Sequence, residues 1–296
     1  MSKPRSKPDA LADGVHKFTA DGITFSYIVT GTGPLLVVQS VGWGPSSSYL
    51  RNGLKDLKSE FKLLFFEPRG NGESTRPDSA SAMGTKDMAY DLEHLREHLR
   101  LPSFALLGHS NGGAIALAYA ERFPSKVTKL ILVNHKLQTF NTSKSWSMFV
   151  AARKDDPIYG PALEHLMELV MDPPSTDEEF SSGLTKAMPY YFADPSNAHI
   201  QVENMEGSLS VWTYLAQSKK DKADPFPHVA ELENVTAKTL ILSGREDAVC
   251  CVSAMERTRD GIKGSRLVVW EDCGHVPWIE KKEEFFAEVT KFLKGN

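Results

Sequence analysis

The stretch LLGHSNGGAIALAYAERFP, residues 106–124, places one serine between glycines where an apolar run passes into an alanine-rich segment. The apolar run predicts a buried strand, and the alanine-rich part predicts a helix. Gly108 and Gly112 flank Ser110 in a G-x-S-x-G pattern, which indicates a nucleophile elbow when a strand precedes it and a helix follows. Small neighbours are needed there because the backbone at the serine is strained. Ser110 is therefore the candidate nucleophile.

A serine hydroxyl needs a general base, and the base needs an acid that orients it. In the elbow pattern the acid and then a histidine follow the serine along the chain. Asp247 follows the apolar run at 240–244, and His275 follows the run at 266–270. Both positions lie where a parallel sheet presents its loops to ligands, so we expect Asp247 to orient His275 and His275 to act as the base. The alternatives are Glu246 and Asp272 for the acid and His109 and His135 for the base.

A serine nucleophile also needs two N–H donors, an oxyanion hole, aimed at the negative charge that develops on the attacked carbonyl. The backbone of Asn111, the residue after the serine, is expected to supply one donor. The loop VGWGPSSS at 41–48 follows a predicted strand, and its glycines allow close approach of the backbone. The Trp43 N–H is therefore the candidate for the second donor, although the same residues are compatible with a simple tight turn.

Strand-like runs alternate with helical stretches along most of the chain. The runs are ITFSYIVTG (23–31), LLVVQS (35–40), KLLFFEP (62–68), FALLGH (104–109), KLILVNH (129–135), KTLILSG (238–244) and RLVVWEDC (266–273), and VHKFTADG (15–22) predicts an antiparallel edge strand. Helices with one apolar face are expected at 85–100 and 281–295. This alternation predicts an α/β fold whose mostly parallel sheet of about eight strands is covered by helices on both faces.

The alternation breaks between residues 137 and 230, where helical patterns and prolines occur without a clear strand. This segment is expected to form a helical cap inserted into a core made of residues 15–136 and 231–296. Residues 1–14 are polar and contain proline, and they are expected to form a flexible tail.

The composition limits the classes of binding partner and the cellular compartment that we expect. Of 296 residues, 41% are apolar and 24% are charged, which is typical of a globular protein. The net charge of −4 does not indicate a nucleic-acid-binding protein. No apolar segment is long enough for a signal peptide or a membrane span, so no membrane association is expected. Cys250, Cys251 and Cys273 show no disulfide spacing, which favours a cytoplasmic location. A buried apolar role is favoured for these cysteines over a metal or redox site.

Five motifs, VGWG, FFEPRGNGES, LLGHSNGG, LILSGRED and CGHVPWIE, occur in an order that resembles the α/β-hydrolase superfamily from about residue 20 to the C-terminus. The likeness is greatest to its capped members of the proline-iminopeptidase or esterase kind. It implies a Ser110–His275–Asp247 catalytic triad with no metal and no organic cofactor. Val41 stands where the superfamily usually has histidine, and Glu67 stands where it often has aspartate. A serine at 110 argues against the epoxide-hydrolase and haloalkane-dehalogenase branches, whose nucleophile is a carboxylate.

Aromatic residues are frequent in the predicted cap: Trp146, Phe149, Tyr159, Tyr190, Tyr191, Phe192, Trp212 and Tyr214. Some would pack the cap and others would line an apolar pocket. The candidate substrate-binding residues are Gly42, His109, His135, Trp212 and Trp278. The expected function is a serine hydrolase that cleaves an ester, lactone or thioester of a hydrophobic small molecule through an acyl-enzyme.

Two alternatives stay open. A proline-iminopeptidase-like aminopeptidase would need carboxylates for the substrate ammonium, and Glu203 and Glu206 in the predicted cap could supply them or could simply form a solvated face. A non-hydrolytic biosynthetic catalyst or a ligand-binding protein on the same fold is the other alternative. The sequence does not indicate an oligomeric state.

Overall fold

Every run predicted as a strand forms one in the computed structural model, which describes residues 9–207 and 209–295. The bounds of the strands are β1 Gly14–Ala20, β2 Ile23–Thr30, β3 Leu35–Gln39, β4 Lys62–Glu67, β5 Phe104–His109, β6 Val127–Val133, β7 Lys238–Gly244 and β8 Arg266–Trp270. They form one eight-stranded sheet in the order β1-β2-β4-β3-β5-β6-β7-β8. Strand β2 is antiparallel to both neighbours, and all pairs from β4 to β8 are parallel. The predicted mostly parallel α/β sheet is confirmed.

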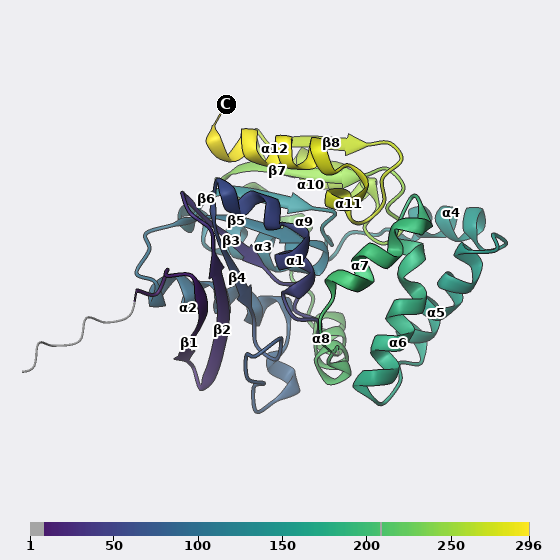
Figure 1. Ribbon diagram of the computed structural model, residues 1–296, viewed down its shortest axis with the longest axis horizontal. Coiled ribbons are helices and arrows are strands. Elements are labelled where there is room, and N and C mark those ends of the chain that lie inside the picture. The colour runs from purple at the N-terminus through teal and green to yellow at the C-terminus, as the bar shows by residue number, and fades with distance from the viewer. Residues whose placement is uncertain (1–8, 208, 296) are drawn as a thin grey trace, which may run out of the picture.

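Helices cover both faces of the sheet (Figure 1). Their bounds outside the β6–β7 connection are α1 Ser48–Gly53, α2 Thr85–His98, α3 Ser110–Arg122, α10 Val252–Gly261, α11 Pro277–Glu280 and α12 Lys282–Lys294. Helices α2, α3 and α10 pack on one face, and α1 and α12 pack on the other. The two faces separate because successive side chains of a strand point to opposite sides.

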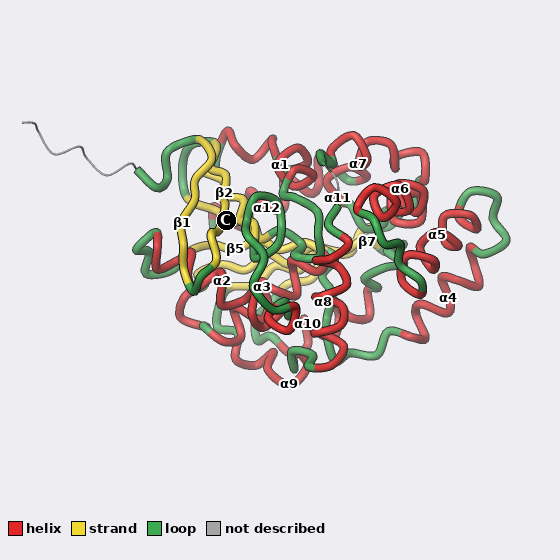
Figure 2. Tube along the Cα trace, turned by 90° about the horizontal axis from the view of Figure 1, so that it is seen from below, coloured by secondary structure: helices red, strands yellow, loops and turns green. Residues whose placement is uncertain are grey.

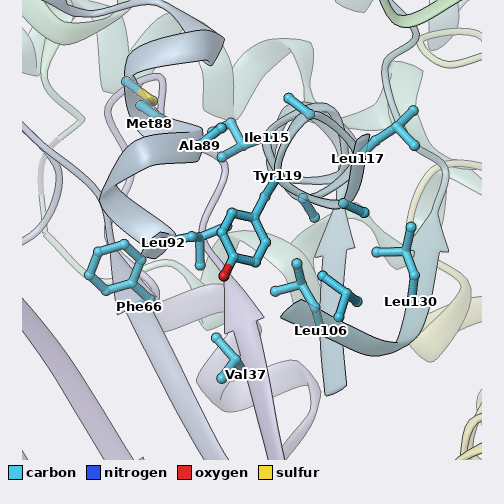
Figure 3. Close-up of a cluster of buried hydrophobic side chains, with 14 of the residues drawn as sticks. Val37, Phe66, Met88, Ala89, Leu92, Leu106, Ile115, Leu117, Tyr119 and Leu130 are labelled. Carbon is cyan, nitrogen blue, oxygen red and sulfur yellow. The ribbon is translucent and has the colours of Figure 1, made fainter. Parts of the chain in front are cut away.

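The core beneath α2 and α3 fixes the position of the β5–α3 junction. Figure 3 shows Leu92 of α2, Tyr119 of α3 and Leu106 of β5 gathered in one cluster of buried side chains. The Tyr119 hydroxyl donates a hydrogen bond of 2.8 Å to Glu93. Because its side chains are buried in this cluster, α3 is a rigid element that can fix the position of a functional residue.

The connection between β6 and β7 is helical, as expected. It carries α4 Ser143–Arg153, α5 Tyr159–Met171, α6 Asp177–Ala187, α7 Ala198–Asn204, α8 Val211–Ala223 and the short α9 His228–Glu231. Figures 1 and 2 show helices α4–α7 gathered beyond the carboxyl ends of the parallel strands. Their description as a separate cap domain with bounds at 137 and 230 stays a prediction.

Residues 1–8 of the expected tail lie outside the described residues. Residues 9–13 form a turn in which the Ala10 and Leu11 carbonyls accept hydrogen bonds from Tyr27 and Lys62, and Gly14 already belongs to β1. Within residues 9–207 and 209–295, no helix combines the length and the apolar character needed to cross a membrane.

His135 follows β6 and is completely buried between α3 and α10. Its Nε2 lies 2.8 Å from the Thr258 hydroxyl, and its Nδ1 has no partner among the described residues. Any side chain at Gly113 of α3 would collide with the His135 side chain, so the ring has no route to solvent on that side. This burial lowers the pKa of His135 to about 3, because the charged imidazolium is poorly solvated there.

Replacing His135 by asparagine is expected to change the pH dependence of stability. Below an unfolded-state pKa of about 6.5 the unfolded chain gains a proton at this residue that the folded chain does not, so the native protein loses about 1.4 kcal/mol per pH unit as pH falls. His135→Asn removes that contribution, and urea unfolding from pH 6.5 to 4.5 measures it. We expect the stability of the wild-type protein to fall more steeply than that of the variant as pH decreases, and parallel curves would contradict the buried neutral histidine.

Candidate active site

Ser110 lies at the sharp junction where β5 ends at His109 and α3 begins. Its φ angle is +55°, a conformation that a residue with a side chain rarely adopts. A Cβ on Gly108 would lie 2.5 Å from the Gly112 carbonyl oxygen, and a Cβ on Gly112 would lie 2.7 Å from the Gln39 carbonyl oxygen. No side chain fits at either position, so both residues must be glycine. The serine hydroxyl faces a cavity at the positive end of α3.

Asp247 and His275 are brought together from the loops after β7 and β8. The Asp247 carboxylate is fully buried, and its Oδ2 lies 2.8 Å from His275 Nδ1. Its Oδ1 accepts the N–H groups of Val249 and Cys250 at 2.8 and 2.9 Å. A carboxylate accepts only, so Nδ1 carries the proton and the other ring nitrogen of His275 is left as a base.

The other acid candidates form no hydrogen bond with His275 among the described residues. Glu246 accepts the Cys273 N–H at 2.9 Å, and its own carbonyl accepts from Arg153 of α4, so it fixes the loops around the histidine. Asp272 is exposed and has no hydrogen bond to His275. Among the described residues, Asp247 is the acid that the fold brings to His275.

The backbone of His275 is held on both sides. Its N–H donates to the Tyr191 carbonyl at 2.7 Å, and the Tyr191 ring lies edge-on at 5.4 Å between ring centres. Its carbonyl accepts from His109 Nε2 at 2.9 Å. Glu280 accepts the N–H groups of Gly274 and Ala193, which joins the histidine loop to the helical connection. Two separate segments therefore fix the direction of the imidazole.

His109 supports this arrangement from the strand side. It lines the cavity, and because its Nε2–H donates to a carbonyl, its Nδ1 accepts from the Tyr49 hydroxyl at 3.0 Å. Burial lowers the pKa of His109 well below the ordinary value, so the ring stays neutral. Both nitrogens are engaged, so His109 positions His275 and has no free base to offer. His135 also lines the cavity, with the Thr258 contact described above.

Trp43 and Asn111, the expected oxyanion donors, line the same cavity as Ser110 and His275. The buried Asn71 side chain holds the peptide units on either side of Trp43, since it accepts the Gly44 N–H at 2.7 Å and donates to the Gly42 carbonyl at 3.0 Å. The Asn111 amide donates to the Val41 carbonyl at 2.6 Å and fixes the start of the same loop. Among the described residues, no hydrogen bond occupies the backbone N–H of Trp43 or Asn111.

The cavity has a volume of about 780 Å³ and reaches from Ser110 into the helical connection. One side is apolar and comes mainly from α5, α6 and the turn after α6. The lining side chains there are Leu166, Met167, Leu169, Val170, Phe180, Leu184 and Met188. Of the aromatic residues noted in the predicted cap, Trp146, Tyr191 and Tyr214 line the cavity.

Three of the predicted substrate-binding residues do not line this cavity. Trp278 is buried in the core, where its ring packs on Tyr49, His109 and Phe285. Trp212 packs beneath the Arg76 guanidinium, 4.8 Å from the ring centre. Gly42 lies against α2 and α3, so its part is limited to the shape of the loop. Sequence position placed these residues near the site, but the direction of each side chain depends on packing.

Asp247, Cys250 and His275 form the one group among the described residues whose ligand atoms could hold a metal ion, with all ligand atoms within 4.8 Å of one another. Asp247 and His275 are already hydrogen-bonded to each other. Burial raises the pKa of the Cys250 thiol well above its ordinary value, which disfavours the thiolate that a metal would need. All three cysteines are buried and unpaired, as expected for small apolar side chains.

Sequence reasoning missed Asn71, Tyr49 and Glu280. Asn71 and Glu280 lie inside the motifs FFEPRGNGES and CGHVPWIE, which were noted without a role for these side chains, and Tyr49 follows the VGWG loop with no distinguishing signal. Their partners are distant in the sequence, so only the folded chain identifies their contacts. Glu67, in the first of these motifs, accepts from Ser47 and from the Glu73 N–H and has a structural role.

Comparison with known proteins agrees with this architecture. The family model described as the alpha/beta hydrolase fold matches residues 34–282. The proline iminopeptidase of Lactobacillus helveticus (strain DPC 4571) is 28% identical over 271 residues, which cover 88% of this chain and 90% of that protein. An alpha/beta fold family hydrolase from Bacillus anthracis str. Sterne superposes with a TM-score of 0.76 at 18% identity, covering 94% of this chain and 98% of the other.

An esterase from Exiguobacterium antarcticum superposes with a TM-score of 0.66 at 23% identity and covers 93% of this chain and 97% of the other. At such identities the two solved structures support the fold alone. The family match extends over most of the chain and includes the regions of Ser110, Asp247 and His275. The chain belongs to the alpha/beta hydrolase fold family.

Proposed function

We propose that this protein is a serine hydrolase that cleaves an ester, lactone or thioester of a small molecule through an acyl-enzyme. The observation that carries the proposal is that Ser110, at a strained strand–helix turn, opens into the same cavity as His275, whose Nδ1 is bonded to the buried Asp247. A nucleophile, a base and an orienting acid in this relation are the parts that acyl transfer requires.

In the proposed reaction His275 takes the Ser110 proton as the hydroxyl oxygen attacks the substrate carbonyl carbon. The backbone N–H groups of Asn111 and Trp43 stabilise the oxyanion of the tetrahedral intermediate. The intermediate then collapses, and His275 gives its proton to the departing alkoxide or thiolate. Water, deprotonated by His275, attacks the acyl-enzyme and releases the acid and Ser110. Asp247 keeps the proton on Nδ1 of His275 throughout and stabilises the imidazolium.

The proline iminopeptidase relative makes an aminopeptidase the second candidate, but the cavity favours it less. Glu203 and Glu206 do not line the cavity, and Glu206 binds Arg51 and Asn52 instead. Asp221 lines it, but its oxygens accept hydrogen bonds from Thr85 and Gln138. Within the described residues, no carboxylate lining the cavity is left free for a substrate ammonium group.

Ser110→Ala is expected to lower the turnover of p-nitrophenyl esters by at least about a thousandfold, because the nucleophile is removed. Asp247→Asn should lower kcat by a similar order without unfolding the chain, since the imidazole loses its orienting carboxylate. Initial rates on short and medium p-nitrophenyl esters, an aromatic lactone and proline p-nitroanilide measure both effects. Full activity of folded Ser110→Ala would refute the proposal, and preference for the anilide would favour the aminopeptidase.

Asn71→Ala is expected to lower kcat by tenfold or more with little change in KM. The variant releases the two peptide units that flank Trp43, so the oxyanion donor loses its direction while the apolar cavity keeps its shape. Steady-state kinetics on one ester measure the change, with circular dichroism as the test of folding. Asn71→Asp keeps the acceptor for Gly44 and should retain more activity than Asn71→Ala. Equal kcat in all three proteins would contradict this positioning role.

A further inference from the structure

The side of the cavity formed by α8 is polar, unlike the side formed by α5 and α6. Five residues of α8 line the cavity: Tyr214, Gln217, Ser218, Asp221 and Lys222. Their spacing places them on one face of the helix. The loop after β6 adds Lys136, Gln138 and Thr139 to the lining. A ligand that fills the cavity must therefore present an apolar part to α5 and α6 and a polar part to α8.

Two lysines belong to this polar side. Lys136 and Lys222 are exposed at its rim, and neither forms a salt bridge within the described part of the chain. The backbone N–H of Lys136 donates to the Ser110 carbonyl at 3.0 Å, so this lysine begins directly beside the proposed nucleophile. Burial raises the pKa of Asp221, and the nearby Lys136 ammonium acts in the opposite direction. The lining of this side therefore contains two lysines and one carboxyl group, that of Asp221.

Two buried amides in the lining each have one atom without a hydrogen-bond partner among the described residues. Gln217 is only 3% exposed and its Nε2 has no hydrogen bond within residues 9–207 and 209–295. Gln201 of α7 is 5% exposed, and its Oε1 is likewise without a partner there. A buried amide that lacks a partner is costly, so such groups are usually satisfied by a ligand or by ordered water. Both amides belong to residues that line the cavity.

We propose that the part of the cavity between α8 and residues 136–139 binds a carboxylate group of the substrate, through the ammonium groups of Lys136 and Lys222 and the Gln217 amide. The substrate is then an ester or lactone that joins an apolar part, held by α5 and α6, to an anionic part. The identity of the bond that is cleaved rests on the proposed serine-hydrolase function, but the charge preference of the cavity does not. A positively charged substrate terminus would be disfavoured at the same place.

The test compares two p-nitrophenyl esters of equal length. One is the mono-p-nitrophenyl ester of adipic or suberic acid, which carries a free carboxylate, and the other is its neutral methyl p-nitrophenyl diester. We expect the wild-type protein to hydrolyse the anionic ester with roughly tenfold higher kcat/KM, mostly through a lower KM, since each exposed ammonium contributes little by itself. The preference should shrink at high salt, where exposed charges are screened.

Replacing Lys136 and Lys222 together by methionine keeps the aliphatic stems and removes both charges. This double variant is expected to hydrolyse the two esters with equal kcat/KM, because the charge that distinguishes them no longer has a partner in the cavity. Lys219→Met is the matched control, because Lys219 lies on α8 but does not line the cavity. An unchanged preference in the double variant, or a wild-type protein that prefers the neutral diester, would overturn the proposal.

Binding separates failure of this inference from failure of the proposed function. Isothermal titration of the Ser110→Ala protein with both esters measures the charge preference without turnover. Tighter binding of the anionic ester that is lost when Lys136 and Lys222 are also replaced supports the carboxylate site, even if no ester is hydrolysed by the wild-type protein. Equal binding of the two esters would reject the site, even if Ser110-dependent hydrolysis is observed.

Discussion

Ser110 keeps a φ of +55° because the backbones of β3, β5 and α3 meet around it with no side chain at Gly108 or Gly112. Such a conformation costs on the order of 1–3 kcal/mol, and it persists only where the surrounding structure over-determines it. Here the packing of α3, which is buried from Asn111 to Glu121, stabilises the strained turn. The sheet, the two glycines and the buried helix thus act together to present one hydroxyl to the cavity.

The helical connection between β6 and β7 does more than cover the cavity. Its Tyr191 carbonyl binds the His275 N–H, and Glu280 joins the His275 loop to Ala193 and Asp194. Arg153 donates to the carbonyls of Tyr190 and Glu246, and its guanidinium lies over the rings of Phe149, Tyr159 and Tyr190. The connection and the loops that carry Asp247 and His275 are therefore one hydrogen-bonded unit, and a shift of one would move the proposed base.

The two walls of the cavity differ in polarity. Helices α5 and α6 supply an apolar surface, whereas α8 and the loop after β6 supply lysines and glutamines. The acid on that wall, Asp221, is occupied by Thr85 and Gln138 and so holds α2 and α8 together. This division is the basis of the proposed preference for an anionic substrate over one with a free ammonium group.

The sequence by itself determined the strands, the strand–helix turn at Ser110 and the order of serine, acid and histidine. Apolar runs, glycine spacing and the strain at one residue are local properties, and they can be read without knowing what packs against them. Only the tertiary structure decided that Asn71 holds the peptides beside Trp43 and that Tyr49 binds His109 across 60 residues. It also turned Trp278 into the core and one face of α8 toward the cavity. Those outcomes depend on side-chain directions and on partners distant in sequence, which are fixed when the elements pack.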